Sequence, residues 1–236
     1  MKSFKKHFKD KSLNIIHASI HGKAEHFDIN EAITSPEEIK SNSETSRRLT
    51  KHYSALLTNK YHKEHIREYT RNSSPLNSYH WDKHKNEVGI HKDYEQNTKN
   101  LDNALHSYKS PEDLTVWSST IHNPEKLKNK EGIVHHPAYL STSILQHVAL
   151  DRDINSTDDS EGNRHHHILK IHVPKESHGA YVYHISKIPG EHEFLLPRGS
   201  NLKHLHTEVI KEPFHNYLKE GKRTKYTYLH SMELQP

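Results

Sequence analysis

Short apolar or alternating runs, separated by turn-forming residues, dominate the chain from Leu114 to its C-terminal end. Each run is bounded by Gly, Pro, Asn or Asp, which is typical of strands in a mostly antiparallel arrangement. Residues 151–167, between two of these runs, are acidic, then polar, then rich in histidine, and we expect a loop there. We predict strands at 114–120, 138–143, 168–173, 180–186, 193–196, 202–210 and 224–230.

The residues before these runs follow helical spacing instead. Residues 35–38 (Ser-Pro-Glu-Glu) have the pattern of a helix start, with a capping serine, a proline and acidic residues in the first turn. Apolar residues then recur with helical spacing from about 43 to 69, and the Asn, Ser and Pro of 70–75 end that helix. Helical spacing returns over 101–108.

Helices followed by strands indicate an α+β fold. We expect a helical lead-in over residues 44–110 and a mostly antiparallel β-sandwich over 111–236. Residues 1–43 are interpreted as an N-terminal extension that begins with a lysine-rich, solvated tail and contains a short strand at 13–20.

Composition excludes several kinds of protein. The 236 residues carry 34 Lys and Arg against 30 Asp and Glu, and this near balance does not favour a nucleic-acid partner. There is no cysteine, so disulfides and thiolate zinc sites are excluded. No apolar stretch is long enough to span a membrane, and the basic N-terminus lacks the apolar core of a secretory signal. We therefore expect a cytoplasmic protein with no membrane partner.

Two carboxylates mark the candidate site. Glu191 and Glu193 lie two residues apart, just before the apolar run Phe194-Leu195-Leu196. If this segment is a strand, both carboxylates point to the same face. Such a pair is costly unless a cationic substrate or a developing positive charge lies between the two groups.

Three motifs in order carry a family resemblance: Ser141-Thr142-Ser143, then Glu191-x-Glu193, then Leu-Pro-Arg-Gly-Ser at 196–200. This order resembles that of the arginine-type mono-ADP-ribosyltransferases. More narrowly, GIVHHPAYLSTS, ILKIHVPK and GEHEFLLPRGS resemble segments of the phage-encoded Alt and Mod transferases. The similarity runs from about residue 44 to the C-terminus, and it implies a split β-sandwich with NAD in the cleft between its sheets.

The resemblance implies a role for each motif residue. Cleavage of the nicotinamide–ribose bond leaves an oxocarbenium-like ribose, which Glu193 would stabilise while it also binds the ribose 2′-hydroxyl. Ser141 would orient Glu193 by a hydrogen bond, and Thr142 and Ser143 would shape the nicotinamide pocket. Tyr139 is a candidate for stacking on nicotinamide, with a place in the core as the alternative.

Glu191 would meet the acceptor. A guanidinium is protonated at ordinary pH, and a carboxylate can align it and take its proton as the new bond forms. The implied activity is transfer of ADP-ribose from NAD to arginine on a target protein, with release of nicotinamide. The target would be a bacterial host protein, such as part of the transcription or translation machinery, recognised through residues 186–190.

One motif departs from the family. The family has an arginine at the end of the first strand, where this chain has Ser118 or Ser119 as the residues that would contact NAD. Another cation (His122, Lys126 or Arg198) could compensate, or NAD binding could be weak. Two further alternatives stay open: a non-catalytic binding protein or virion component on the same fold, and an NAD-linked modification that involves RNA.

Histidine is the compositional oddity, with 26 residues. The run His165-His166-His167 resembles a metal site in composition, but the side chains of consecutive strand residues cannot all face one ion. The pair His135-His136 has no third ligand at suitable spacing. We therefore expect no metal, and NAD is the only small molecule implied, as a substrate.

Overall fold

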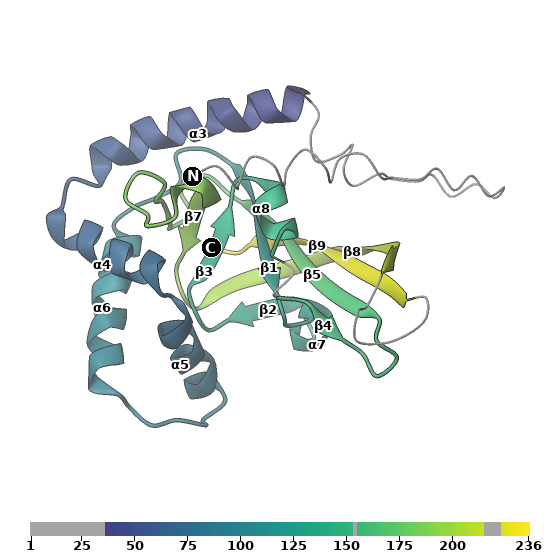
Figure 1. The fold of residues 1–236 in the computed structure, drawn as a ribbon. Coiled ribbons are helices and arrows are strands. Elements are labelled where there is room, and N and C mark those ends of the chain that lie inside the picture. Colours follow the sequence, from purple (N-terminus) through teal and green to yellow (C-terminus); the bar gives the residue numbers. More distant parts are fainter. Residues whose placement is uncertain (1–35, 153–154, 215–222) are drawn as a thin grey trace, which may run out of the picture. The chain divides into compact units, whose positions relative to one another are not determined.

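The computed structural model describes residues 36–152, 155–214 and 223–236, and Figure 1 shows their fold. The expectations for the lysine-rich tail, the strand at 13–20 and the capping role of Ser35 lie outside these residues. The described residues belong to one unit, Ser35–Pro236.

Within the described residues, four helices precede the strands: α3 (Pro36–Leu56), α4 (Lys60–Arg71), α5 (Ser74–His84) and α6 (Lys92–His106). The single helix predicted over 43–69 is wrong, because the chain breaks between α3 and α4. Asn59 makes the break: its side chain accepts hydrogen bonds from the backbone N–H groups of Tyr61 and His62 and so caps α4. The helix start predicted at Pro36 and the break at 70–75 are confirmed.

The strands are β1 (Leu114–Thr120), β2 (Ile133–His136), β3 (Leu140–Ser143), β4 (Thr157–Asp158), β5 (Arg164–Val173), β6 (Ala180–Tyr181), β7 (Glu193–Leu196), β8 (Ser200–Phe214) and β9 (Arg223–Leu234). Two short helices, α7 (Pro124–Leu127) and α8 (Gln146–Leu150), lie between strands. The strand predictions for 114–120 and 193–196 are confirmed in full. Residues 164–167 belong to β5, so the loop predicted there is too long, and β2 was missed.

The strands pair in the order β2-β8-β9-β5-β1-β3-β7-β6, with β4 beside β5. Among the described strands, all pairings are antiparallel except β5 with β9, so the sheet is mixed and mostly antiparallel. β1 and β3 are joined at a single pair, Trp117 opposite Ser143. This weak link divides the strands into a long-strand half (β2, β8, β9, β5, β1, β4) and a short-strand half (β3, β7, β6).

The core lies between the helices and both halves of the sheet. Buried residues of α3, α4 and α6, such as Leu49, Ile66 and Leu105, pack in one cluster with Ile171 of β5 and Phe194 of β7. The cluster connects the two halves through side chains where the backbone pairing is weak, and it therefore holds the split in place.

Gly179 permits the close approach of β6 and β7. Its φ of +150° lies in a region that L side chains rarely adopt, and an added Cβ would lie 2.7 Å from Cε1 of Phe194 and 2.9 Å from the carbonyl oxygen of Leu195. Any larger residue would push β6 off β7.

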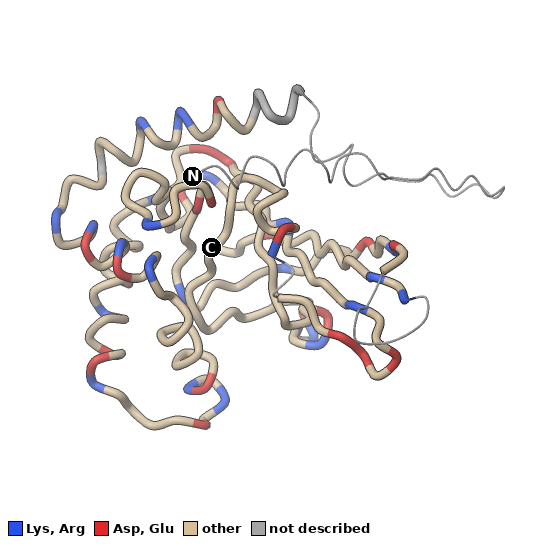
Figure 2. Tube along the Cα trace, viewed as in Figure 1, with Lys and Arg blue, Asp and Glu red and all other residues tan. Residues whose placement is uncertain are grey.

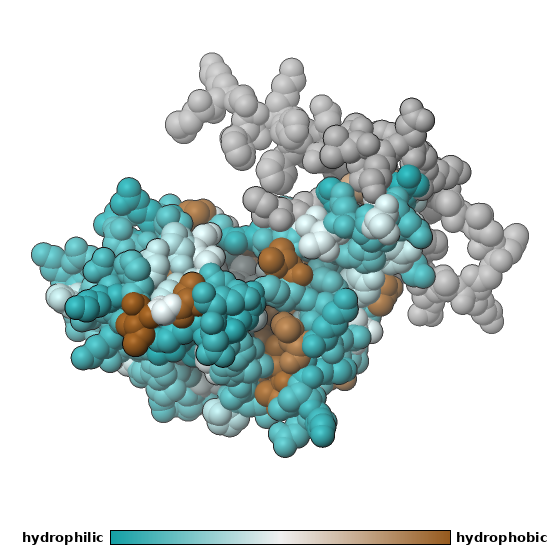
Figure 3. All heavy atoms as spheres, turned by 90° about the horizontal axis from the view of Figure 1, so that it is seen from below, coloured by the Kyte–Doolittle hydropathy of each residue, from teal (hydrophilic) through white to brown (hydrophobic). Residues whose placement is uncertain are grey.

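The surface is polar and its charges are mixed. Figure 2 shows Lys and Arg interspersed with Asp and Glu along the described helices and strands, and Figure 3 shows separate hydrophobic patches in a mostly hydrophilic face. Within the described residues, no helix combines the length and apolar character that a membrane span needs.

Candidate active site

A narrow pocket opens at the split between β1 and β3. Its cavity volume is about 10 Å³, enough for roughly one water molecule. The pocket brings together most of the residues that the sequence singled out, and its lining is Trp117, Ser118, Ser119, Ser141, Thr142, Ser143, Val148, Ala149, Arg152 and Glu191.

Glu193 begins β7 directly behind this lining and is only 4% exposed. The hydroxyl of Ser141, on β3, donates a hydrogen bond of 2.6 Å to its Oε1. Burial, helped by the charge of Glu191, raises the pKa of Glu193 to about 7, although the hydrogen bond from Ser141 and the charge of Arg152 lower it. At neutral pH the carboxyl group of Glu193 is therefore partly protonated and partly ionised.

Glu191 reaches the pocket by a different route from the one predicted. It ends the 3-10 helix η2 (Pro189–Glu191), so the two carboxylates do not share one strand face. His192 between them has φ 46° and ψ 48°, a left-handed conformation that is uncommon for a residue with a side chain. This residue turns the chain, so that Glu191 lines the pocket while Glu193 enters the sheet.

Side chains from distant segments hold His192 in this conformation. Its Nδ1 lies 2.8 Å from the hydroxyl of Tyr181 and 3.2 Å from that of Ser46, and its ring stacks on Tyr183 at 4.7 Å. Left-handed strain at such a position persists only where surrounding contacts maintain it. The geometry of the carboxylate pair therefore depends on α3 and β6 as well as on the motif.

The Ser-Thr-Ser motif joins β3 to the carboxylate segment. Thr142 donates a hydrogen bond to the carbonyl oxygen of Phe194, and Ser143 donates one of 2.7 Å to the carbonyl oxygen of Glu191. Ser143 also accepts a hydrogen bond from the backbone N–H of Leu145. The two side chains thus line the pocket and fix its walls.

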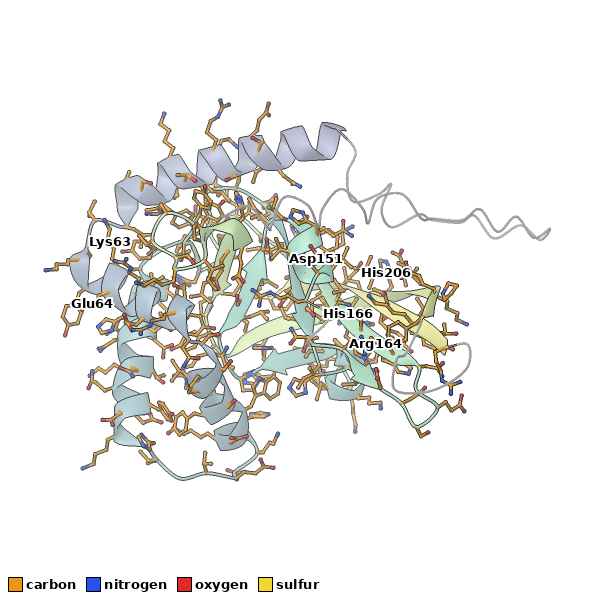
Figure 4. All side chains as sticks on the ribbon, in the orientation of Figure 1. Lys63, Glu64, Asp151, Arg164, His166 and His206 are labelled. Carbon is orange, nitrogen blue, oxygen red and sulfur yellow. The ribbon has the colours of Figure 1, made fainter. Side chains whose placement is uncertain are left out.

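The two serines that stand where the family has an arginine both line the pocket. Ser118 donates a hydrogen bond to the carbonyl oxygen of Ser141, at 2.9 Å, and so joins β1 to β3 across the split. Ser119 lies 2.8 Å from Nε2 of His166, a β5 residue labelled in Figure 4. Neither serine brings positive charge to the pocket.

Arg152 supplies that charge. It follows Asp151, which is labelled in Figure 4 at the end of α8, and its Nη2 lies 2.5 Å from Oε1 of Glu191. Of the pocket lining given above, it is the one residue with a positively charged side chain. In the sequence, Arg152 stands out only as the single Lys or Arg between Lys130 and Arg164, which does not link it to Glu191.

The three cations considered from the sequence lie elsewhere. Arg198 pairs with Asp102, with Nη2 2.8 Å from Oδ2. His122 and Lys126 line a separate cavity beside β5. None of the three lies in the pocket lining, so the compensation considered for them stays a hypothesis. Arg152 was missed because nothing local in the sequence links it to Glu191.

Tyr139 does not join the pocket. Its side chain is 1% exposed, its hydroxyl donates a hydrogen bond of 2.7 Å to Oδ1 of Asp102, and its ring packs against Tyr69. The nicotinamide-stacking role considered for it is wrong, because the ring and the hydroxyl are both committed to the core. Trp117, by contrast, lies on the pocket wall.

The fold agrees with the comparisons to known proteins. The family model described as ADP-ribosyltransferase exoenzyme matches residues 22–227. The chain belongs to this family, and the match covers every residue of the pocket.

The chain is similar to individual ADP-ribosyltransferases in sequence and in structure. A mono-ADP-ribosyltransferase C3 from a Clostridium botulinum C phage is 26% identical over 172 residues, which are 63% of this chain and 65% of that protein. Among solved structures, the Plx2a ADP-ribosyltransferase toxin from Paenibacillus larvae has a TM-score of 0.59 at 22% identity, covering 85% of this chain and 97% of that one. The Clostridium limosum C3 exoenzyme has a TM-score of 0.61 at 16% identity, with 83% and 95% covered. These structures confirm the predicted fold class, while the narrower resemblance to Alt and Mod stays a prediction.

Proposed function

We propose that the protein transfers a single ADP-ribose from NAD to arginine side chains of target proteins and releases nicotinamide. The observation that carries the proposal is the buried Glu193, oriented by Ser141 at the split of the sheet, with Glu191 and Arg152 at the pocket beside it. Membership of the ADP-ribosyltransferase exoenzyme family supports the same reaction.

Glu193 suits the charge that develops during bond cleavage. As nicotinamide leaves, the ribose becomes cationic, and an ionised carboxylate in a poorly solvated position stabilises that cation strongly. The hydrogen bond from Ser141 favours the ionised form and fixes one carboxylate oxygen, which leaves the other for the ribose 2′-hydroxyl. Glu193 would thus act in the cleavage step.

Glu191 suits a guanidinium acceptor, and its contact with Arg152 supports this. In the free protein its carboxylate already holds one guanidinium, that of Arg152, at 2.5 Å. An acceptor arginine that replaces Arg152 at this carboxylate would be aligned by the same charge-assisted contact. Glu191 would then take up the proton released as the guanidinium nitrogen bonds to the ribose carbon.

Arg152 would then bind the cofactor. A pocket of this volume cannot hold nicotinamide, because pockets for ligands of that size are on the order of hundreds of Å³. NAD entry therefore requires the exposed Arg152 side chain to swing away from Glu191. The freed guanidinium would pair with the diphosphate and supply the charge that Ser118 and Ser119 do not.

Target recognition is assigned to the loop before Glu191. Residues 186–190 include the first two residues of η2, and Ile188, just before η2, is 49% exposed. We propose that this loop contacts a bacterial host protein, such as a component of transcription or translation, in the host cytoplasm after phage delivery or expression. The phage source of the C3 relative and the resemblance to Alt and Mod support this setting.

Label transfer from radioactive NAD to a bacterial extract tests the proposal. Wild type is compared with Glu193→Gln and with the control Glu208→Gln, which alters an exposed glutamate of β8. We expect labelled protein with wild type and the control only, and the label should be released by hydroxylamine, which cleaves arginine-linked ADP-ribose. Equal labelling by Glu193→Gln would remove the catalytic assignment, and absence of NAD binding by calorimetry would favour a non-catalytic binding protein. Label in the RNA fraction alone would favour the RNA alternative.

A further inference from the structure

A second cluster of polar side chains lies on residues that take no part in the pocket. Glu125 of α7, His204 of β8 and His230 of β9 each offer one ligand atom, and these atoms lie within 4.8 Å of one another. The three residues are far apart in the sequence, so only the tertiary structure brings them together. Their burial is graded, with Glu125 exposed, His204 half-buried and His230 buried.

The three side chains converge on the hydroxyl of Thr207. His204 Nε2 and His230 Nδ1 are each 2.9 Å from the hydroxyl oxygen of Thr207, and that hydroxyl also hydrogen-bonds the carboxylate of Glu125. Oε1 of Glu125 lies 4.0 Å from His204 Nε2. A zinc ion at the centre of such a triangle needs each atom to move inward by less than about 1 Å to reach ligand distances of about 2.0–2.1 Å.

A neighbouring histidine orients one of these ligands. His230 uses Nδ1 toward the cluster, and its other ring nitrogen, Nε2, lies 3.0 Å from Nδ1 of His167. Histidine ligands characteristically use the second nitrogen in such a hydrogen bond, which fixes the ring and its tautomer. His167 and His230 also stack at 5.2 Å, so the orientation has two supports.

The backbone of β8 aims His204 inward. The pairing of β8 with β9 shifts register between His204 and His206, as a β-bulge does. His204 therefore faces the cluster, while His206, labelled in Figure 4, is 58% exposed and contacts Glu208. Two histidines of one strand thus have opposite surroundings.

We propose that Glu125, His204 and His230 bind one divalent transition-metal ion of the zinc type. Two imidazoles and one carboxylate form a donor set that zinc accepts, with a fourth position for water or the Thr207 hydroxyl. The ion would join α7 to the β8–β9 hairpin, and because α7 follows β1, it would also secure the end of the strand that carries Ser118 and Ser119.

Cobalt titration tests the site directly, since tetrahedral Co²⁺ absorbs strongly in the visible range and can be displaced by zinc. The protein is first stripped with EDTA. Wild type should bind one equivalent with this spectrum, and His204→Ala should weaken binding by about 100-fold or more. The control His206→Ala removes a histidine from the same strand and should stay within about twofold of wild type.

Two further variants keep the test decisive if His204→Ala folds poorly. Glu125→Gln alters an exposed side chain and should weaken cobalt binding, and His167→Gln should weaken it by about 10-fold to 100-fold through loss of the orienting hydrogen bond. If all three variants bind cobalt like wild type, the ion is held by scattered surface histidines and the proposal is wrong. None of these residues lines the carboxylate pocket, so the outcome is independent of the transferase assay.

Discussion

The two halves of the sheet hold buried polar groups in different charge states at neutral pH. In the long-strand half, burial lowers the pKa of His167 to about 4, so at neutral pH this ring is uncharged, and it is hydrogen-bonded to His230. In the short-strand half, burial raises the pKa of Glu193 to about 7, and part of the population carries a buried charge. A neutral, paired group costs the fold little, whereas an ionised one costs it stability.

The two halves also differ in how extensively their strands pair. β8 and β9 pair over most of their length, whereas β6 and β7 share only two residue pairs. Glu193 begins the short strand β7, Glu191 ends η2 just before it, and the pocket lies beside them at the weak link between β1 and β3. The long-strand half thus has the more extensive backbone pairing, and the short-strand half carries Glu193.

The largest expected effect is on catalysis by the short-strand half. Glu193→Gln should lower the rate of nicotinamide release by about 10³-fold or more, because an amide cannot stabilise the ribose cation. Glu208→Gln in the long-strand half should leave the rate within about twofold. The rate is measured by single-turnover release of nicotinamide, and comparable losses in the two variants would erase the contrast between the halves.

The next effect is on stability, and its sign follows from the pKa of Glu193. The folded protein holds this proton up to about pH 7, whereas the unfolded chain releases it at the ordinary value near 4.5. Raising the pH from 4.5 to 7 therefore costs the wild type about 3 kcal/mol at this residue, because each pKa unit is worth about 1.4 kcal/mol.

The Glu193→Gln variant should not lose stability in this way as the pH rises, because its amide does not titrate. In urea unfolding, the stability of the variant relative to wild type should increase by about 2.5 kcal/mol between pH 5 and pH 8. A constant difference between the two proteins across this range would mean that Glu193 titrates normally.

Glu191→Gln should divide the two steps of the reaction. An amide cannot take up the acceptor proton, so transfer to arginine should fall by about 100-fold while NAD hydrolysis is largely kept. Label transfer and nicotinamide release are measured in parallel, with Glu212→Gln of β8 as the control. Equal loss of both activities would contradict the separate role of Glu191.

The smallest effect concerns Arg152. Arg152→Ala should weaken NAD binding by about tenfold in calorimetry, since it removes the positive charge expected at the diphosphate. Loss of this charge should also raise the apparent pKa of Glu193 in the pH–rate profile, because Arg152 opposes the increase caused by burial. Lys211→Ala, a charge removed from β8, should change neither quantity. Unchanged NAD affinity in Arg152→Ala would mean that Arg152 does not take the role of the family's first-strand arginine.

What the sequence determined by itself was local. The alternation and turn residues around 114–120 and 193–196 were sufficient to predict β1 and β7 in full, because a strand's pattern is written in its own residues. The spacing of Ser141 and Glu193 likewise predicted their pairing through the family resemblance, and the hydrogen bond of 2.6 Å is present.

Tertiary structure decided everything that depends on distant segments meeting. Only the fold brings Arg152 to Glu191, commits Tyr139 to the core through Asp102, and holds His192 in its left-handed turn. The cluster of Glu125, His204 and His230 has the same origin. Because side chains alternate along β5, the run His165-His166-His167 cannot form a metal site by itself. The pairing of β5 with β9, however, brings His167 next to His230. Contacts of this kind join residues far apart in the sequence, so no local pattern records them.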